Sequence, residues 1–436
     1  MEKVIYEYKF NLRIDLSKIF TVFIMLFPLL SIYASPISIL SYGELILAIV
    51  VVCMFIHILK NDTNIKYTPF YYYLLYALIS TIILSLLLKL LKSGFSVNDM
   101  LQRVLRDSFY FAIIVVFGPI FFDFQFGKKL LKGISILLCL YMIIQVTVFM
   151  LLKVYIPGII PWAKTTISGG AYGAEVIEHF AKDAQIDGYA RGVGFFSEPA
   201  VSAQFLTVAL LFELFSKSKR KRWSLIVLYT VGMLVTVSVN AYVALAVCFI
   251  IFILYSNRKN SKRLFISMIL CAILAVAALS IAESISLTVW ERITELFSGN
   301  MYYGSSSVRV FRGPAFYMNM PLFYRLFGSG FGNFVEFKNA YDISTVYEVA
   351  DEYLNTNAYI LISSGLIGFI LYVVMLYKHI KHRVAFSKAM LLLVLVYGLS
   401  CSIYSSAQFV IMLLFLMNAP LKKEVNKNES KHNYAS

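Results

Sequence analysis

The residues of this chain best suited to chemistry are arginines that stand in patterned, glycine-rich stretches. Arg191 opens the stretch RGVGFFSEPA, in which Glu198 precedes Pro199, and Arg309 and Arg312 lie three residues apart farther along. An arginine presents a planar fork of donors that binds phosphate oxygens in pairs. Fixed arginines also stabilise developing negative charge without a metal ion. These residues therefore predict a site for an anionic substrate.

The stretch that begins at Arg191 allows two interpretations. Gly192 and Gly194 permit close approach and unusual backbone dihedrals, and Pro199 suits the first turn of a helix. A carboxylate at Glu198 is favoured there by the helix dipole. In the first interpretation Glu198 caps the helix and pairs with Arg191. In the second, Arg191 clamps a phosphate and Glu198 acts as a general base or orients the arginine.

A second group of arginines lies beyond residue 300. Arg309, Arg312 and Phe316 recur at steps of three and four, so they share one face of a predicted helix over 308–318. Arg325 follows, and each arginine that contacts a phosphate would contribute roughly 1.5–3 kcal/mol. Together these residues indicate a second anion-binding segment.

Glycines 328, 330 and 332 follow in the run FGSGFGNF. Gly328 and Gly330 suit a tight turn whose exposed backbone amides could receive an anion. The flanking sequence does not fit a Walker or Rossmann loop. Asn357 then opens an apolar segment in which Ser364, Gly365 and Gly368 favour close packing of a neighbouring helix. Asn357 is retained as a candidate site residue.

Composition places these segments in a membrane protein. The chain has 436 residues, of which 60% are hydrophobic and only 14% are charged, a balance typical of a bilayer environment. The five cysteines sit in apolar runs, which excludes a disulfide framework. No metal and no cofactor are expected. The polar, mixed-charge N-terminus does not fit a cleaved signal peptide.

The hydrophobic runs predict an all-α polytopic membrane protein with about twelve transmembrane helices. The predicted spans are 19–38, 42–59, 69–91, 107–122, 130–153, 199–216, 223–239, 241–256, 264–282, 356–377, 385–401 and 404–420. They make residues 1–436 a single integral membrane domain. The segment 89–107 is predicted to continue as a helix through Arg103 and Arg106, which are expected to extend towards the membrane interface.

The basic clusters give this topology an orientation. They occupy 217–222, 258–263, 378–383 and the tail after 420, so the positive-inside tendency places both termini in the cytoplasm. The net charge of +15 then reflects contact with membrane lipid headgroups and no nucleic acid partner. Two long loops, 154–198 and 283–355, fall on the extracytoplasmic side. The second is predicted to contain amphipathic helices over 287–297 and 308–318 that form a lid on the membrane surface.

Four motifs give the chain a family resemblance. They occupy 191–199, 306–309, 321–330 and 357–368. In motif and layout the chain resembles the Wzy-type O-antigen and capsule polymerases, within the O-antigen ligase and polymerase superfamily. The resemblance implies a glycosyltransferase-C-like fold in a bacterial plasma (inner) membrane. It also implies transfer of a growing glycan from undecaprenyl pyrophosphate to the non-reducing end of a lipid-linked repeat unit. A chain-length regulator is an implied partner.

The resemblance also assigns roles. Arg191 and Arg309 would stabilise the leaving pyrophosphate, and Arg312 or Arg325 would support them. Gly328, Gly330 and Asn357 would contact the substrate. Glu198 is the first choice as general base, and the fallbacks are Asp351 and Glu352.

Two other functions remain open. Ligases of the superfamily carry a histidine where this chain has Thr356, which favours a polymerase over a ligase. A flippase or transporter of lipid-linked saccharides would also fit twelve spans. Such transporters usually show two similar halves, and the long loops after the fifth and ninth predicted spans break that symmetry.

Overall fold

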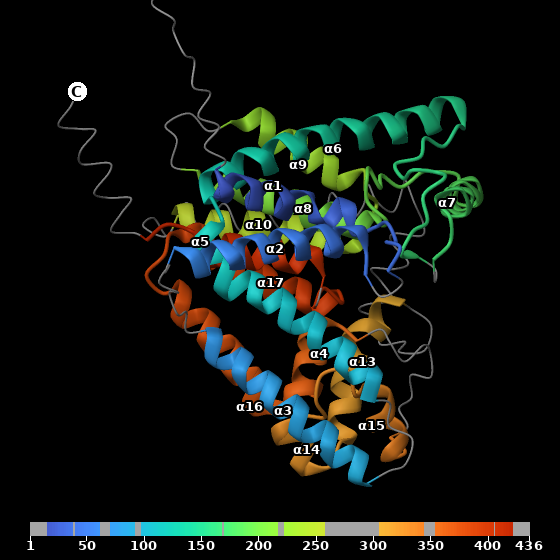
Figure 1. Ribbon diagram of the computed structural model, residues 1–436. Helices are drawn as coiled ribbons and strands as arrows, with labels where there is room; N and C mark the ends of the chain where they lie inside the picture. The colour runs from blue at the N-terminus through green and yellow to red at the C-terminus, as the bar shows by residue number, and fades with distance from the viewer. Residues whose placement is uncertain are drawn as a thin grey trace, which may run out of the picture.

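The computed structural model describes residues 15–37, 40–61, 70–91, 97–167, 170–216, 222–257, 305–343, 354–404 and 406–421. Within these ranges the protein is helical, and its only β contacts are isolated bridges such as that between Tyr33 and Thr165. The all-α prediction is therefore confirmed for the described residues (Figure 1).

Six helical segments are long and apolar enough to cross a membrane. They are α2 (Tyr42–Lys60), α3 (Phe70–Leu91), α6 (Phe124–Leu152), α10 (Val239–Asn257), α16 (Thr356–Ile380) and the run of α4 (Val97–Ala112), η1 (Ile113–Phe117) and α5 (Gly118–Phe121). The shorter apolar helices are α1 (Leu16–Leu30), α8 (Pro199–Leu214), α9 (Trp223–Leu234), α17 (Ala385–Ser400) and α18 (Ala407–Asn418). These helices match the predicted spans within a few residues at most ends. The predicted span 264–282 lies outside the described residues, so the total of twelve stays a prediction.

The main bundle is built around two helices that are buried on every side. In α8 every residue from Ser202 to Leu214 is buried, and in α18 most residues are. A helix that is apolar all round has to lie inside a bundle or a membrane. Helices α1, α6, α9, α10 and α17 surround these two (Figure 1).

A second group of helices forms a lobe with its own apolar core. Helices α3 and α16 run side by side, and α13 (Ser305–Asn319), α14 (Leu322–Phe327) and α15 (Phe334–Ala340) cluster at one end of the pair (Figure 1). The core of the lobe includes Leu84, Phe316, Phe337 and Ile362. Helix α13 confirms the prediction of a helix over 308–318, whereas the predicted helix 287–297 lies outside the described residues.

The first long loop contains a helix that the sequence did not predict. Helix α7 (Gly173–Asp187) stands apart from the bundle at the end opposite the first turn of α6 (Figure 1). Tyr172 precedes the helix and Gly188 follows its last residue. The φ of Gly188 is 75°, the left-handed conformation that commonly follows a helix.

Candidate functional site

The site residues of the lobe are positioned by a break in α16. At Gly365 the backbone adopts φ 67° and ψ −178°, so the helix is interrupted within an apolar segment. The carbonyl groups before the break accept hydrogen bonds from the glycine turn: Ser329 N donates to Ile362 O, and Gly330 N donates to Ser363 O, each over 2.9 Å. Irregular backbone at membrane depth has to be satisfied by protein or by water. The turn therefore completes the broken helix.

The remaining amides of the turn also have partners within the protein. Gly328 N donates to Tyr324 O over 2.7 Å, and Phe331 N donates to Thr81 Oγ1 over 3.1 Å. Gly328 and Gly330 have φ values of 91° and 87°, so the prediction of a tight glycine turn is confirmed. The prediction of exposed amides is wrong, because the amides that were expected to receive an anion bind α16 and its neighbours instead.

Helix α13 presents the predicted arginine face to the lobe. Arg312 is 3% exposed and Phe316 is 2% exposed, so the face that they share packs inward. Gly313 lies against Ala358, which brings α13 close to the first turn of α16. Arg309 is on the same face by helical spacing, and its side chain lies outside the described set. A buried guanidinium needs polar partners, so Arg312 marks a polar region inside the lobe.

The Arg325 side chain is hydrogen-bonded within the protein. Its Nε donates to Met320 O over 2.6 Å, and the Tyr317 hydroxyl donates to Arg325 O over 2.9 Å. These two bonds join α14 to α13. The neighbouring Tyr324 is buried, and this burial raises the pKa of its hydroxyl.

The first turn of α16 contains three polar residues, two of which are fully hydrogen-bonded within the protein and one of which is not. Asn355 caps the helix by accepting from Ala358 N over 2.8 Å. Thr356 is fully buried and donates to Cys401 O over 2.9 Å while accepting from Ile403 N over 2.7 Å. The Nδ2 of Asn357 donates to Leu395 O, also over 2.9 Å, whereas its buried Oδ1 has no hydrogen-bond partner among the described residues. Asn357 thus has a buried amide oxygen without a described hydrogen-bond partner, and this oxygen faces Gly398 of α17.

The stretch from Arg191 folds against the α9–α10 turn. An Arg191 guanidinium nitrogen donates to Val237 O over 3.2 Å, and Val237 has a φ of 47°, which is unfavourable for a β-branched residue. Gly194 has a φ of 66°, as expected from its sequence position. Arg191 therefore holds a strained turn in addition to any role with substrate.

Glu198 remains open to solvent at the start of α8. It occupies the cap position ahead of Pro199, but its side chain makes no capping hydrogen bond. The prediction that the Glu198 side chain caps the helix is therefore wrong, its pairing with Arg191 stays a prediction, and the residue is exposed.

Helix α17 connects the two segments that carry site residues. It packs against α8 and α10 on the side of Glu198 and Arg191, and it also packs against α13 and α16. The fallback acids Asp351 and Glu352 lie outside the described residues. Within those residues no three His, Cys, Asp or Glu side chains gather closely enough to hold a metal ion.

A buried ionic cluster in the bundle was missed from the sequence. Arg106 Nε lies 2.9 Å from Glu44 Oε1, and the Tyr110 hydroxyl donates to the same oxygen over 2.6 Å. Glu44 is 5% exposed and also accepts from Ser41 N at the start of α2. Arg106 was expected to extend to the interface and instead pairs across helices. The Ser41–Glu44 spacing of a capping box was the available signal.

Asp107, the next residue, lines a small cavity of about 10 Å³ with Thr81, Phe331 and Tyr404. Its side chain is 3% exposed. An ionisable residue within a membrane segment is a candidate functional residue by default. The cavity borders the glycine turn, because Phe331 lines the cavity and belongs to that turn.

Replacement of Glu44 tests the ionic cluster. Glu44→Gln should destabilise the protein by on the order of 3 kcal/mol, because it leaves Arg106 partly buried without its counter-ion. Thermal unfolding in detergent measures this loss. Glu178→Gln is the matched control, since Glu178 pairs with Lys182 on the exposed surface of α7 and should change stability by less than about 1 kcal/mol. Equal shifts in the two variants would contradict the assignment.

A scan against protein-family models found no match to this chain, and a search of curated proteins found none either.

Proposed function

We propose that the protein is a membrane glycosyltransferase that polymerises a bacterial polysaccharide. The substrate is an undecaprenyl-pyrophosphate-linked oligosaccharide, and the growing chain passes to the non-reducing end of a new lipid-linked repeat unit. The proposal includes a bacterial plasma membrane location, cytoplasmic termini and a reaction site at the opposite face. It rests on the motif resemblance together with the placement of the site residues in a helical, apolar protein.

The observation that carries the proposal is the position of Arg312. It is buried on an amphipathic helix that packs across the first turn of α16, where the Asn357 Oδ1 has no partner among the described residues. Arginines on α13 and an amide on the neighbouring first turn of α16 suit a substrate that combines phosphate with sugar hydroxyls. The anion is received by arginines and the hydroxyl groups by amides.

The chemistry follows from these groups. A hydroxyl oxygen of the acceptor sugar attacks the anomeric carbon of the growing chain, and the bond from that carbon to the pyrophosphate oxygen breaks. The bonding electron pair leaves with the pyrophosphate, whose charge Arg191 and Arg309 stabilise. The hydroxyl proton passes to the exposed carboxylate of Glu198, which acts as the general base.

A ligase is the second candidate, and Thr356 argues against it. The Thr356 side chain is fully buried, and its hydroxyl is engaged with the chain between α17 and α18. A residue so held cannot take up a proton from an acceptor in solution. A ligase that used this position would need a different base.

The test is a glycan ladder in a host that lacks this gene but makes the repeat unit. We expect the wild type to give a ladder of polymer lengths, because each transfer adds one repeat. Glu198→Gln should reduce polymerisation by roughly 100-fold or more while it preserves membrane abundance, because an amide cannot accept the proton. Glu175→Gln, on the exposed α7, is the control and should leave the ladder unchanged.

Two outcomes would overturn the proposal. Loss of all surface repeats in the deletion strain, with lipid-linked units trapped inside, would identify a flippase. Normal polymer on the lipid carrier, combined with failure to transfer it to a final acceptor, would identify a ligase.

A further inference from the structure

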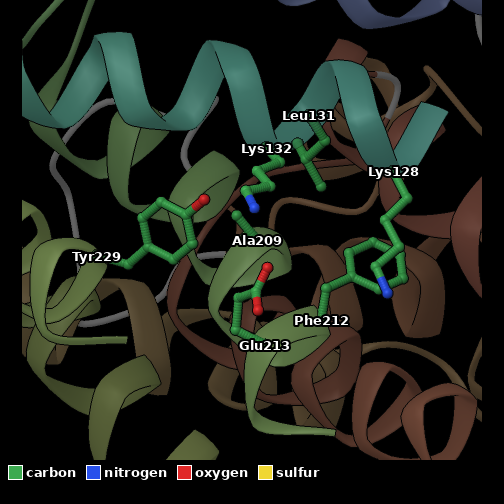
Figure 2. Close-up of a pocket in the computed structure, with 7 residues that line it drawn as sticks. All are labelled: Lys128, Leu131, Lys132, Ala209, Phe212, Glu213 and Tyr229. Atoms are coloured by element: carbon green, nitrogen blue, oxygen red, sulfur yellow. The ribbon is translucent and has the colours of Figure 1, made fainter. Parts of the chain in front are cut away.

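Helix α6 contributes polar side chains to two different places in the bundle. Near its start, Lys128 and Lys132 line a cavity with Glu213 and Tyr229 (Figure 2). This cavity measures about 10 Å³, which is room for about one water molecule, so it is too small for a substrate. The second place is at Gln145, about 20 Å beyond Lys132 along the helix. Gln145 is 2% exposed, and a buried amide is costly unless it is hydrogen-bonded.

The side chain of Gln145 binds both ends of the first long loop. Its Oε1 accepts from Gly194 N over 2.8 Å, and its Nε2 donates to Ile156 O over 2.9 Å. Both partners are backbone groups whose roles as donor and acceptor are fixed, so they determine which way round the amide lies. One side chain of α6 therefore joins the first residues of the loop to its last residues.

The two ends of the loop also contact each other and α6. An added Cβ at Gly158 would overlap Gly194 O, so the two backbones touch. Tyr141 of α6 donates to Pro157 O over 2.6 Å and stacks on Phe195, with the ring centres 4.6 Å apart. These contacts hold the backbone around Gly194 in one position relative to the helix.

The segment that Gln145 holds is the one that carries Arg191. Gly192 N donates to Val235 O over 2.9 Å, so the chain passes from the α9–α10 turn to α6 between Arg191 and Gly194. Three residues of fully extended chain span at most about 11 Å, which leaves little freedom between these two fixed points. The position of the Arg191 guanidinium therefore depends on where Gln145 holds Gly194.

We propose that Gln145 is a positioning residue for Arg191. The inference rests on the proposed function, in which the Arg191 guanidinium stabilises the leaving pyrophosphate. Gln145 acts through the backbone of Gly194, from which the chain leads back to Arg191. A positioned donor needs no rearrangement when negative charge develops on the leaving group. Loss of Gln145 therefore slows the step in which the pyrophosphate leaves.

The test measures kcat and KM of the purified full-length protein in liposomes that contain the lipid-linked repeat unit. Gln145→Met is close in size but makes neither hydrogen bond, so we expect kcat to fall about tenfold with KM within about twofold of the wild type. Gln145→Asn keeps an amide but is one methylene shorter, so it should lose as much. Gln145→Glu should recover most of the loss, because a protonated carboxyl group presents the same acceptor and donor.

A double variant separates positioning from general destabilisation. Since Gln145 acts through Arg191, Gln145→Met combined with Arg191→Ala should be no more than about twofold slower than Arg191→Ala alone. Leu131→Ala is the matched control, because Leu131 is fully buried on the same helix and lies at the small cavity near its start. This variant should lower the unfolding temperature without changing kcat.

Three results would contradict these expectations. Wild-type kcat in Gln145→Met or Gln145→Asn, with an unchanged unfolding temperature, would overturn the role of Gln145. Losses that multiply fully in the double variant would overturn it too, because Gln145 would then act independently of Arg191. Absence of polymer from the wild type in the same assay would instead contradict the proposed function on which the inference rests.

Discussion

Gly365→Ala is expected to leave little folded protein, with a loss of stability of about 4 kcal/mol or more. At φ 67° and ψ −178° the backbone of residue 365 occupies a region that is essentially restricted to glycine. An added Cβ would also overlap the carbonyl oxygen of Leu326, which is backbone and cannot rotate away. Gly328→Ala should have the same effect, because its Cβ would overlap the Ser363 carbonyl oxygen.

The measurement is the yield of monodisperse protein after solubilisation, followed by thermal unfolding of whatever is recovered. Gly133→Ala on α6 is the control, because a Cβ at Gly133 meets no other atom within 4 Å. Alanine in a helix interior is favoured over glycine by about 0.5–1 kcal/mol, so this variant should match or exceed the wild type. Wild-type yield and stability in Gly365→Ala would show that the break in α16 is not required.

Arg309→Ala and Arg191→Ala are expected to lower the rate of polymerisation by about 10- to 100-fold each. The estimate takes roughly 1.5–3 kcal/mol for one charged hydrogen bond to the leaving pyrophosphate and a tenfold change in rate for about 1.4 kcal/mol. Arg309→Lys should recover part of the rate, because lysine keeps the charge but loses the planar fork. The rate is measured with purified protein in liposomes that contain the lipid-linked repeat unit.

Stability has to be followed alongside the rate, since Arg191 also holds the Val237 carbonyl. Lys182→Ala is the control on the same end of the molecule, because Lys182 pairs only with the exposed Glu178 among its described neighbours. It should change neither rate nor stability. If both arginine variants were stable and polymerised at the wild-type rate, the proposed stabilisation of pyrophosphate would be excluded.

Two features of the candidate site could be predicted from sequence patterns alone. The helical face shared by Arg312 and Phe316 follows from spacing alone, and α13 has both residues buried. The glycine turn was also predictable, because alternating glycines before an apolar segment favour positive φ values. What the turn binds was not predictable. Its amides meet carbonyl groups of Ile362 and Ser363, more than thirty residues later in the chain.

The sequence alone predicted most of the apolar helices of the described residues, but not the polar helix α7. The physical reason is that a backbone in a bilayer has to satisfy its own hydrogen bonds, so length and hydropathy are enough to locate most helices. Tertiary structure decided which polar groups meet. Glu44 accepts from Tyr110, which is 66 residues away, and Glu198 is exposed at the start of α8, where it makes no capping hydrogen bond. Such pairings depend on which helix faces pack together, and no local period in the sequence records that choice.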